Sequence, residues 1–317
     1  MKSAVLFIVF NRPDTTLKVF EAIRAAKPPK LYVAADGPRL NRDGEKDLCN
    51  KVRQIATAVD WPCELKTLFS DVNLGCNLGP SQGISWLFEN EEEGIILEDD
   101  VLPLSSFFPY CDELLERYRY VENVGVISGC NFISRYYLTS ESYFFSRYNH
   151  IWGWASWRRA WLHFDGKMHL WPQWNKCLGL KTISDGNIFF ELYWRNNFNK
   201  VFNKPTDIWD YQWLFSCWYY GMLTVLPKYN QTYNLGCGGN ATHTTGTIPK
   251  FIKKATPENL IFPLTHPKNI NRSIKADALI DKKILRLTLL YTLKRYLIYI
   301  PLVGRLLLKI KYIFNLT

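Results

Sequence analysis

An apolar run that ends in three consecutive acids constrains the fold of this chain more than any other feature of its sequence. Residues 95–97 are apolar, Glu98, Asp99 and Asp100 follow, and Val101 is apolar again. Such a run is typical of a buried strand, and buried carboxylates are costly unless they are paired or bound to a metal. Oxygen ligands suit a hard cation such as Mg²⁺ or Mn²⁺. The run therefore predicts a core strand with a metal site at its end. The alternative is a solvated acidic turn after an edge strand.

Strand-like and helix-like segments alternate through the first part of the chain. Strand-like runs cover residues 4–10, 31–35, 64–69, 95–97 and 124–128, and helical patterns cover 15–26, 43–58, 76–90 and 106–120. This alternation predicts an α/β fold, a mostly parallel sheet with helices on both faces. Ligands of such sheets bind at the carboxyl ends of the strands. Asn11, Arg12, Asp36, Asp71 and the acid triplet (Glu98, Asp99 and Asp100) all follow predicted strands, so we expect a ligand site there.

The second half of the chain is rich in tryptophan. All but two of the twelve tryptophans lie between Trp152 and Trp218. We expect each of these rings to be core, because aromatic side chains bury large areas; the alternative is stacking on a sugar in an acceptor site. A helix is predicted from about 208 to 218 and a strand at 223–227. Asp210 lies near the start of that helix, where it is either a cap or a functional carboxylate.

Composition bounds the possible functions. The 317 residues are 47% hydrophobic and 21% charged, as in a globular protein of one large or two small domains. The body is nearly neutral, which argues against a nucleic-acid-binding surface. The eight cysteines lack metal or redox spacing. With no export signal recognised and no long apolar span, we expect a cytoplasmic protein.

The basic charge is concentrated at the C-terminus. Residues 282–317 mix apolar side chains with basic ones and contain no acid, and Pro301 divides the segment into two predicted helices. A basic amphipathic helix lies on the surface of an anionic membrane. We therefore expect the tail to bind the inner face of such a membrane peripherally; the alternative is a helix pair packed on the body. The basic residues are Lys282, Lys283, Arg286, Lys294, Arg295, Arg305, Lys309 and Lys311.

Residues 3–245 resemble the GT-A glycosyltransferases. The motifs that carry the resemblance are Asn11-Arg12-Pro13 after the first strand, Asp36 after the second, Asn73-Leu74-Gly75, and Leu97-Glu98-Asp99-Asp100-Val101. The last motif is similar to the acidic triplet of the N-acetylglucosaminyltransferase I type, a variant of the DxD motif. The chain is also similar to uncharacterised bacterial relatives that share the segment Trp-Gly-Trp-Ala-Ser-Trp-Arg at 152–158.

The resemblance implies transfer of a sugar from a nucleotide-diphosphate donor, by default a UDP-sugar, to a hydroxyl of a glycan or lipid-linked acceptor in bacterial surface polysaccharide synthesis. It implies that Asp100 binds Mn²⁺ or Mg²⁺. Glu98 and Asp99 would hold the ribose or a metal-bound water, and Asn11, Arg12 and Asp36 would surround the base and ribose. Residues 1–130 would form the nucleotide-sugar half, 131–265 the acceptor half and 266–317 the membrane-associating tail.

The resemblance also implies a catalytic base. In an inverting transfer a carboxylate removes the proton of the attacking acceptor hydroxyl. Asp210 occupies the corresponding place, with Asp207 in reserve, and a retaining transfer would need a different arrangement. His243, in the Gly-rich loop 234–244, would be a late ligand of the metal or the diphosphate; the alternative is a structural histidine.

Two other functions were weighed against glycosyl transfer. A sugar nucleotidyltransferase normally carries a Gly-rich loop with Arg and Lys after its first strand, whereas this chain has Phe10-Asn11-Arg12-Pro13. A non-catalytic carbohydrate-binding protein built on the tryptophans would need neither the acid triplet nor Asp210.

Overall fold

A central sheet organises the molecule in the computed structural model, which describes residues 1–204, 207–236, 255 and 257–289. Within these residues the sheet has eight strands in the order β3-β2-β1-β4-β8-β6-β9-β7. β1 to β4 are mutually parallel, β8 runs antiparallel to β4 and β6, β9 is parallel to β6, and β7 is antiparallel to β9. The strands are β1 (Ala4–Val9), β2 (Lys30–Ala35), β3 (Glu64–Phe69), β4 (Glu93–Glu98), β6 (Val124–Ser128), β7 (Tyr143–Ser146), β8 (Trp154–Trp157) and β9 (Leu223–Pro227).

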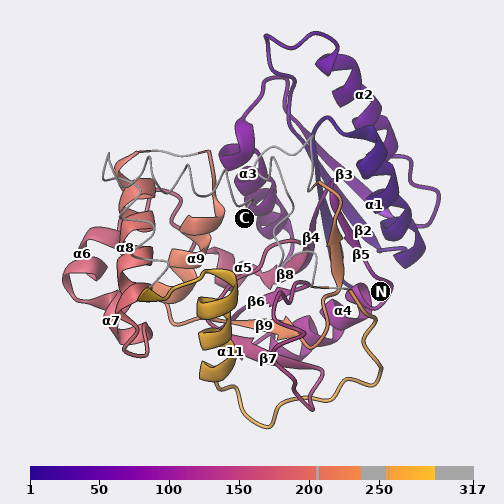
Figure 1. The fold of residues 1–317 in the computed structure, drawn as a ribbon. Helices are drawn as coiled ribbons and strands as arrows, with labels where there is room; N and C mark the ends of the chain where they lie inside the picture. The colour runs from indigo at the N-terminus through magenta and orange to yellow at the C-terminus, as the bar shows by residue number, and fades with distance from the viewer. Residues whose placement is uncertain (205–206, 237–254, 256, 290–317) are drawn as a thin grey trace, which may run out of the picture.

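Helices cover both faces of the sheet, as the sequence predicts (Figure 1). Along β1, Val5, Phe7 and Val9 join one buried cluster, with side chains of α1, α2 and α4. Ala4 and Leu6 point the other way and pack with α3. Because both faces are buried, the strand is apolar throughout rather than alternating. The helices are α1 (Pro13–Ala26), α2 (Glu45–Ala56), α3 (Gly75–Asn90) and α4 (Phe107–Tyr118).

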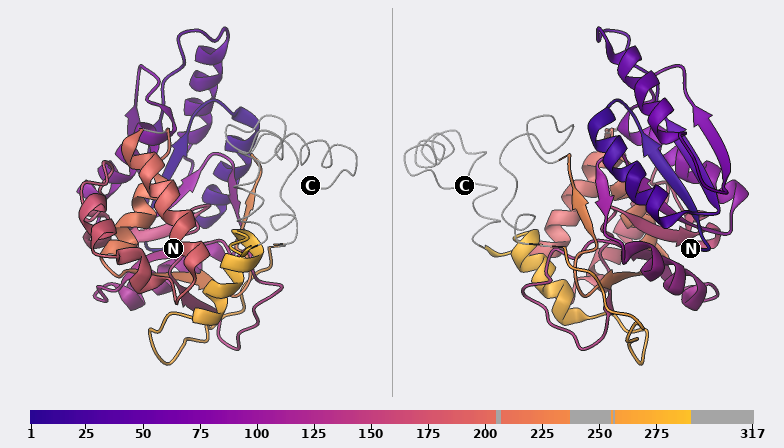
Figure 2. Two further views of the ribbon diagram at one scale, coloured as in Figure 1. Left: turned by 60° about the vertical axis from the view of Figure 1, so that its left-hand side comes forward. Right: turned by 90° about the vertical axis from the view of Figure 1, so that its right-hand side faces the viewer.

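A helical lobe packs beside the second half of the sheet (Figure 2). Its core is aromatic, with Trp171, Phe190, Trp194, Phe198 and Phe215 buried together. The expectation that the tryptophans are core is therefore confirmed for most of them. The helices and turns of this half are α5 (Arg158–Trp161), α6 (Trp171–Lys176), α7 (Gly179–Ile183), α8 (Ile188–Asn203), α9 (Asp210–Tyr219), α11 (Ile274–Leu279) and the π-helical turn η1 (Ile280–Ile284).

α11 and η1 are held by buried ion pairs. Arg147, whose side chain is 4% exposed, lies 2.8 Å from Asp281 and 3.1 Å from Asp185. Asp277 accepts hydrogen bonds from the Ser146 hydroxyl at 2.5 Å and from the Arg147 amide at 3.3 Å. Arg272 pairs with Asp185 and Asp277. We call Arg147, Arg272, Asp185, Asp277 and Asp281 the Arg147 network.

The start of the predicted tail is part of the folded body. Leu287 is buried and Leu285 packs against the aromatic core, so residues 282–289 match the alternative of a segment packed on the body. Residues 290–317, with Pro301, lie outside the described part of the chain. No helix within that part is both long and apolar enough to cross a membrane.

Two short strands bring a distant segment to the end of β4. β5 (Val101–Pro103) pairs antiparallel with β10 (Thr232–Asn234), and Asp99 and Asp100 form the turn between β4 and β5. The residues after β10 consequently lie against the acid triplet. The sequence analysis did not predict β5, β7, β8 or β10.

Candidate active site

A cavity of about 1560 Å³ lies at the carboxyl ends of β1, β2 and β4. Most of the predicted site residues line it, namely Asn11, Arg12, Asp36, Glu98, Asp99, Asp100, Asp207 and Asp210. These side chains come from both halves of the chain, so the fold does bring them together. Asp71, the exception, is exposed and is not among the lining residues. The predicted ligand His243 lies outside the described residues.

The acid triplet stands at the floor of this cavity. Asp99 is buried, and its Oδ2 accepts a hydrogen bond from the Phe10 backbone amide at 3.1 Å. The Arg12 guanidinium donates to Asp99 Oδ1 at 3.3 Å and to Asp100 Oδ2 at 2.8 Å. β1 and β4 are neighbours in register at Ile8 and Glu98, which is why the residues after β1 meet the acids after β4.

The triplet is poor in compensating positive charge. Burial, with added repulsion from Asp100, Asp99 and Asp210, raises the pKa of Glu98 to about 8. Burial and the neighbouring Asp100 raise the pKa of Asp99 to about 7, although Arg12 opposes the shift. Burial also raises the pKa of Asp100, again against Arg12. Raised pKa values mean that the ionised carboxylates are disfavoured here, and an additional bound cation would stabilise them.

These residues fit a metal ion only in part. In the described part of the chain, no group of three or more His, Cys, Asp or Glu side chains is arranged to hold a metal. The triplet nevertheless supplies carboxylate oxygens, the donors that Mg²⁺ and Mn²⁺ prefer. Mg²⁺ is commonly held by one or two carboxylates together with waters and substrate phosphates. The side chains present match that mode, in which the phosphate-bearing ligand completes the coordination.

Gly236 is a neighbour of the triplet that the sequence analysis missed. Leu235 donates its amide to the Asp100 carbonyl at 2.7 Å, which places the next residue against the Asp100 side chain. A Cβ atom at Gly236 would overlap Asp100 Oδ2. Only glycine fits there, and the single available signal was the start of the Gly-rich loop.

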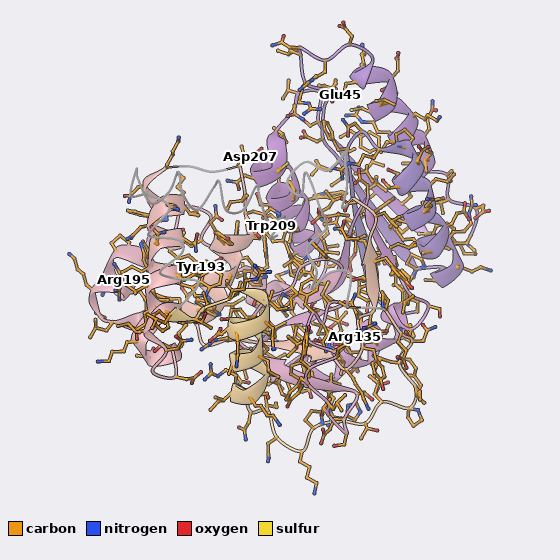
Figure 3. All side chains as sticks on the ribbon, in the orientation of Figure 1. Glu45, Arg135, Tyr193, Arg195, Asp207 and Trp209 are labelled. Carbon is orange, nitrogen blue, oxygen red and sulfur yellow. The ribbon has the colours of Figure 1, made fainter. Side chains whose placement is uncertain are left out.

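A second charged group forms the wall beside Asn11. The Asn11 amide donates to Glu45 Oε1 at 2.8 Å, and the Arg39 amide and guanidinium donate to the same carboxylate. The Arg39 guanidinium lowers the pKa of Glu45 to about 2. Arg39 also lies 5.5 Å from the centre of the Phe10 ring. Glu45, at the start of α2 (Figure 3), and Arg39 were not predicted.

Asp36 organises the loop that starts α3. Its Oδ1 accepts from the amides of Gly37 at 2.8 Å and Leu74 at 2.7 Å. Its Oδ2 accepts from the Asn73 side chain at 2.9 Å and the Gly75 amide at 3.0 Å. Asp36 lines the cavity as expected, and these four bonds show that it also positions the Asn73-Leu74-Gly75 turn.

The two candidate bases differ in their surroundings. Asp207 is exposed and accepts the Asn77 amide at 2.9 Å, so it caps the first turn of α3. Asp210 is half-buried, begins α9 and lies near enough to Glu98 to raise its pKa. Figure 3 shows Asp207 and Trp209 between α3 and the helices α8 and α9. Asp210 is therefore the carboxylate of this segment that belongs to the acid group.

Trp152 is an exception among the tryptophans of its segment. Trp154, Trp157 and Trp161 are buried, whereas Trp152 is half-buried and lines the cavity. Its ring packs edge-to-face on Phe132, with the ring centres 5.3 Å apart. Trp152 thus offers an aromatic surface close to the acids.

Comparisons with known proteins give distant structural similarities alone. Neither a family model nor a curated protein matches the sequence. Mouse xyloside xylosyltransferase 1 is 10% identical, with a TM-score of 0.33 over 68% of this chain and 81% of the other. HddC from Yersinia pseudotuberculosis is 7% identical, with a TM-score of 0.29 over 50% and 77%. A UDP-glucose pyrophosphorylase solved with UDP-glucose is 11% identical, with a TM-score of 0.25 over 46% and 62%. At these scores, the α/β fold rests on the strand order described above.

Proposed function

We propose that this protein is a glycosyltransferase of the GT-A type that uses a nucleotide-diphosphate sugar. The observation that carries the proposal is the acid triplet at the end of β4, which lines a large cavity with Asp99 buried and Glu98 and Asp100 partly buried. When bound there, Mn²⁺ or Mg²⁺ would stabilise the charge that develops on the leaving diphosphate, as a Lewis acid. Asp100 would hold the ion, and His243 is a further candidate ligand.

The residues around the triplet would bind and orient the donor. Arg12, within reach of Asp99 and Asp100, is placed to bind phosphate. The wall made by Asn11, Arg39 and Phe10 would face the nucleoside, with a uridine nucleotide as the default.

Asp210 would act as the base of an inverting transfer. It lines the same cavity as the triplet, although it begins α9 and is therefore far from β4 along the chain. A carboxylate there can accept the proton of an acceptor hydroxyl while the diphosphate is held at the triplet. Trp152 would stack on the apolar face of an acceptor sugar.

The acceptor is proposed to be a glycan, or a glycan built on a lipid carrier, as in bacterial surface polysaccharide synthesis. The basic residues of 290–317 would bind the inner face of an anionic membrane, each contributing about 1 kcal/mol near the surface. Deleting residues 290–317 should then release the protein from membranes and leave the described fold intact. Equal membrane binding by the shortened chain would contradict this part of the proposal.

Donor turnover tests the proposed function. The protein is incubated with a panel of nucleotide sugars and Mn²⁺, and free nucleoside diphosphate is measured. We expect turnover of one donor class and its loss in Asp100→Ala. Asp71→Ala, which removes an exposed aspartate after β3, should keep full activity. If Asp100→Ala keeps its activity as Asp71→Ala does, the proposal is contradicted. Formation of a nucleotide sugar from a nucleoside triphosphate would indicate a nucleotidyltransferase instead.

A further inference from the structure

Arg12 occupies the place at the triplet where a metal ion is expected. Its guanidinium lies between Asp99 Oδ1 at 3.3 Å and Asp100 Oδ2 at 2.8 Å. Both carboxylate side chains are almost enclosed, 7% and 15% exposed. Within the described residues, Arg12 is thus the cation that neutralises these two acids.

The backbone of Arg12 is fixed, but its side chain is long and 26% exposed. The Arg12 carbonyl accepts hydrogen bonds from the Thr16 amide at 3.0 Å and the Thr16 hydroxyl at 2.7 Å, at the first turn of α1. The guanidinium can therefore exchange partners within the cavity without any change in the fold of β1 or α1.

Asp100 Oδ2 is crowded from two sides. Arg12 contacts it directly, and Gly236 lies so close that even a Cβ atom would overlap it. A second cation that binds this oxygen has to displace the guanidinium. Displacement leaves a partly buried guanidinium without these two carboxylates, which is costly unless the guanidinium finds another anion. A diphosphate is such an anion, and guanidinium binds phosphate oxygens well, often through two hydrogen bonds.

We propose that Arg12 is a resident counter-cation, which a divalent metal and the nucleotide diphosphate displace together. Arg12 leaves the acids for the phosphates as the metal reaches Asp100. The metal and the nucleotide therefore bind cooperatively, and each raises the affinity for the other by the same factor. This inference rests on the proposed function, because it assumes that the triplet binds a metal with a nucleotide.

Binding of Mn²⁺ without any sugar donor tests the inference. Free Mn²⁺ is measured by electron paramagnetic resonance during titration of the full chain, with and without UDP. We expect UDP to raise the Mn²⁺ affinity of the wild type about tenfold or more. Arg12→Met should bind Mn²⁺ about tenfold more tightly than the wild type when UDP is absent, and UDP should add less. Arg12→Lys keeps a cation and should resemble the wild type.

Arg24→Met is the control, because it also removes a guanidinium, but one whose ion pairs lie at the surface and which does not line the cavity. Its Mn²⁺ affinity without UDP should equal that of the wild type. If the wild type binds Mn²⁺ with UDP but folded Arg12→Met binds Mn²⁺ no more tightly than the wild type, the Arg12 inference is wrong and the proposed function stands. If the wild type binds no Mn²⁺ even with UDP, both the inference and the proposed metal dependence are wrong.

Discussion

The acid triplet and the Arg147 network are both groups of buried carboxylates, and they differ in how their charge is compensated. In the Arg147 network, guanidinium groups, the Ser146 hydroxyl and the Arg147 amide contact the buried Asp277 and Asp281, although burial still raises the pKa of Asp277 to about 6. At the triplet, three acids and nearby Asp210 face a large cavity, with Arg12 as the paired cation. Compensated acids fix the position of a segment, whereas undercompensated acids beside a cavity favour a ligand that brings positive charge.

The largest expected effect is on the rate of donor turnover and results from substitution of Asp210, beside the acid triplet. Asp210→Asn should lower donor turnover about 10²–10⁴-fold, since it removes the proposed base. The affinity for UDP with Mn²⁺ should stay the same, because Asp210 does not hold the donor. Steady-state turnover and UDP titration measure the two quantities.

Asp207→Asn is the control for that substitution, because Asp207 caps α3 through the Asn77 amide. It should change stability by less than about 0.5 kcal/mol, because asparagine caps a helix about as well as aspartate, and leave turnover within a few-fold of the wild type. Unchanged turnover in Asp210→Asn would assign the base to another residue.

Local sequence patterns were sufficient to predict much of this fold. The strands at 64–69, 124–128 and 223–227 have the predicted bounds. β8 was missed because its tryptophans gave no alternation that separates strand from buried helix. The predicted helix starts at Thr15 and Asp43 are also slightly wrong, since α1 begins at Pro13 and α2 at Glu45.

The site residues that directly follow strands were predictable from the sequence, whereas those that lie in loops were not. Asn11, Arg12 and the triplet are adjacent because β1 and β4 are parallel neighbours. Arg39 and Gly236 reach the cavity, and Glu45 reaches Asn11, through turns whose course no periodicity reveals. The contacts that fix Asp36 likewise depend on how the loop before α3 folds back.

The next effect is on stability and belongs to the Arg147 network. Arg147→Met should lower the free energy of unfolding by about 3–5 kcal/mol, because it leaves Asp281 buried without its guanidinium partner and Asp277 paired with Arg272 alone. Urea unfolding measures the change. Arg24→Met, which breaks ion pairs at the surface, should cost less than about 1 kcal/mol. Equal costs for the two variants would mean that the network does not hold the fold.

Glu45 provides a buried, paired carboxylate behind the cavity-lining residues Asn11 and Arg39. Glu45→Gln should lower the free energy of unfolding at pH 7 by about 1.5–3 kcal/mol, through the weakened bonds from Arg39 and Asn11. The folded-state pKa is lowered from 4.5 to about 2, so this stability is present above pH 4.5 and is lost as the pH falls toward 2. Unfolding measured across that range should show the wild type and the variant converging. A constant difference would contradict the pairing.

The smallest effect has the opposite sign. Glu98→Gln should raise the free energy of unfolding of the metal-free protein by about 0.5 kcal/mol, because it removes repulsion with Asp99 and Asp100. Asp281→Asn makes the same kind of change in the Arg147 network and should be destabilising. If both Glu98→Gln and Asp281→Asn lower the free energy of unfolding, the two acid groups do not differ in the compensation of their charge.

The central claim is that the triplet holds a cation against a diphosphate, and an anomalous-scattering experiment tests it most directly. Crystals soaked with MnCl₂ and UDP are measured at the manganese edge. The account predicts a manganese peak beside Asp100, with the UDP phosphates next to it and Arg12 turned toward them. A manganese peak remote from the triplet, or UDP bound outside the cavity, would contradict it.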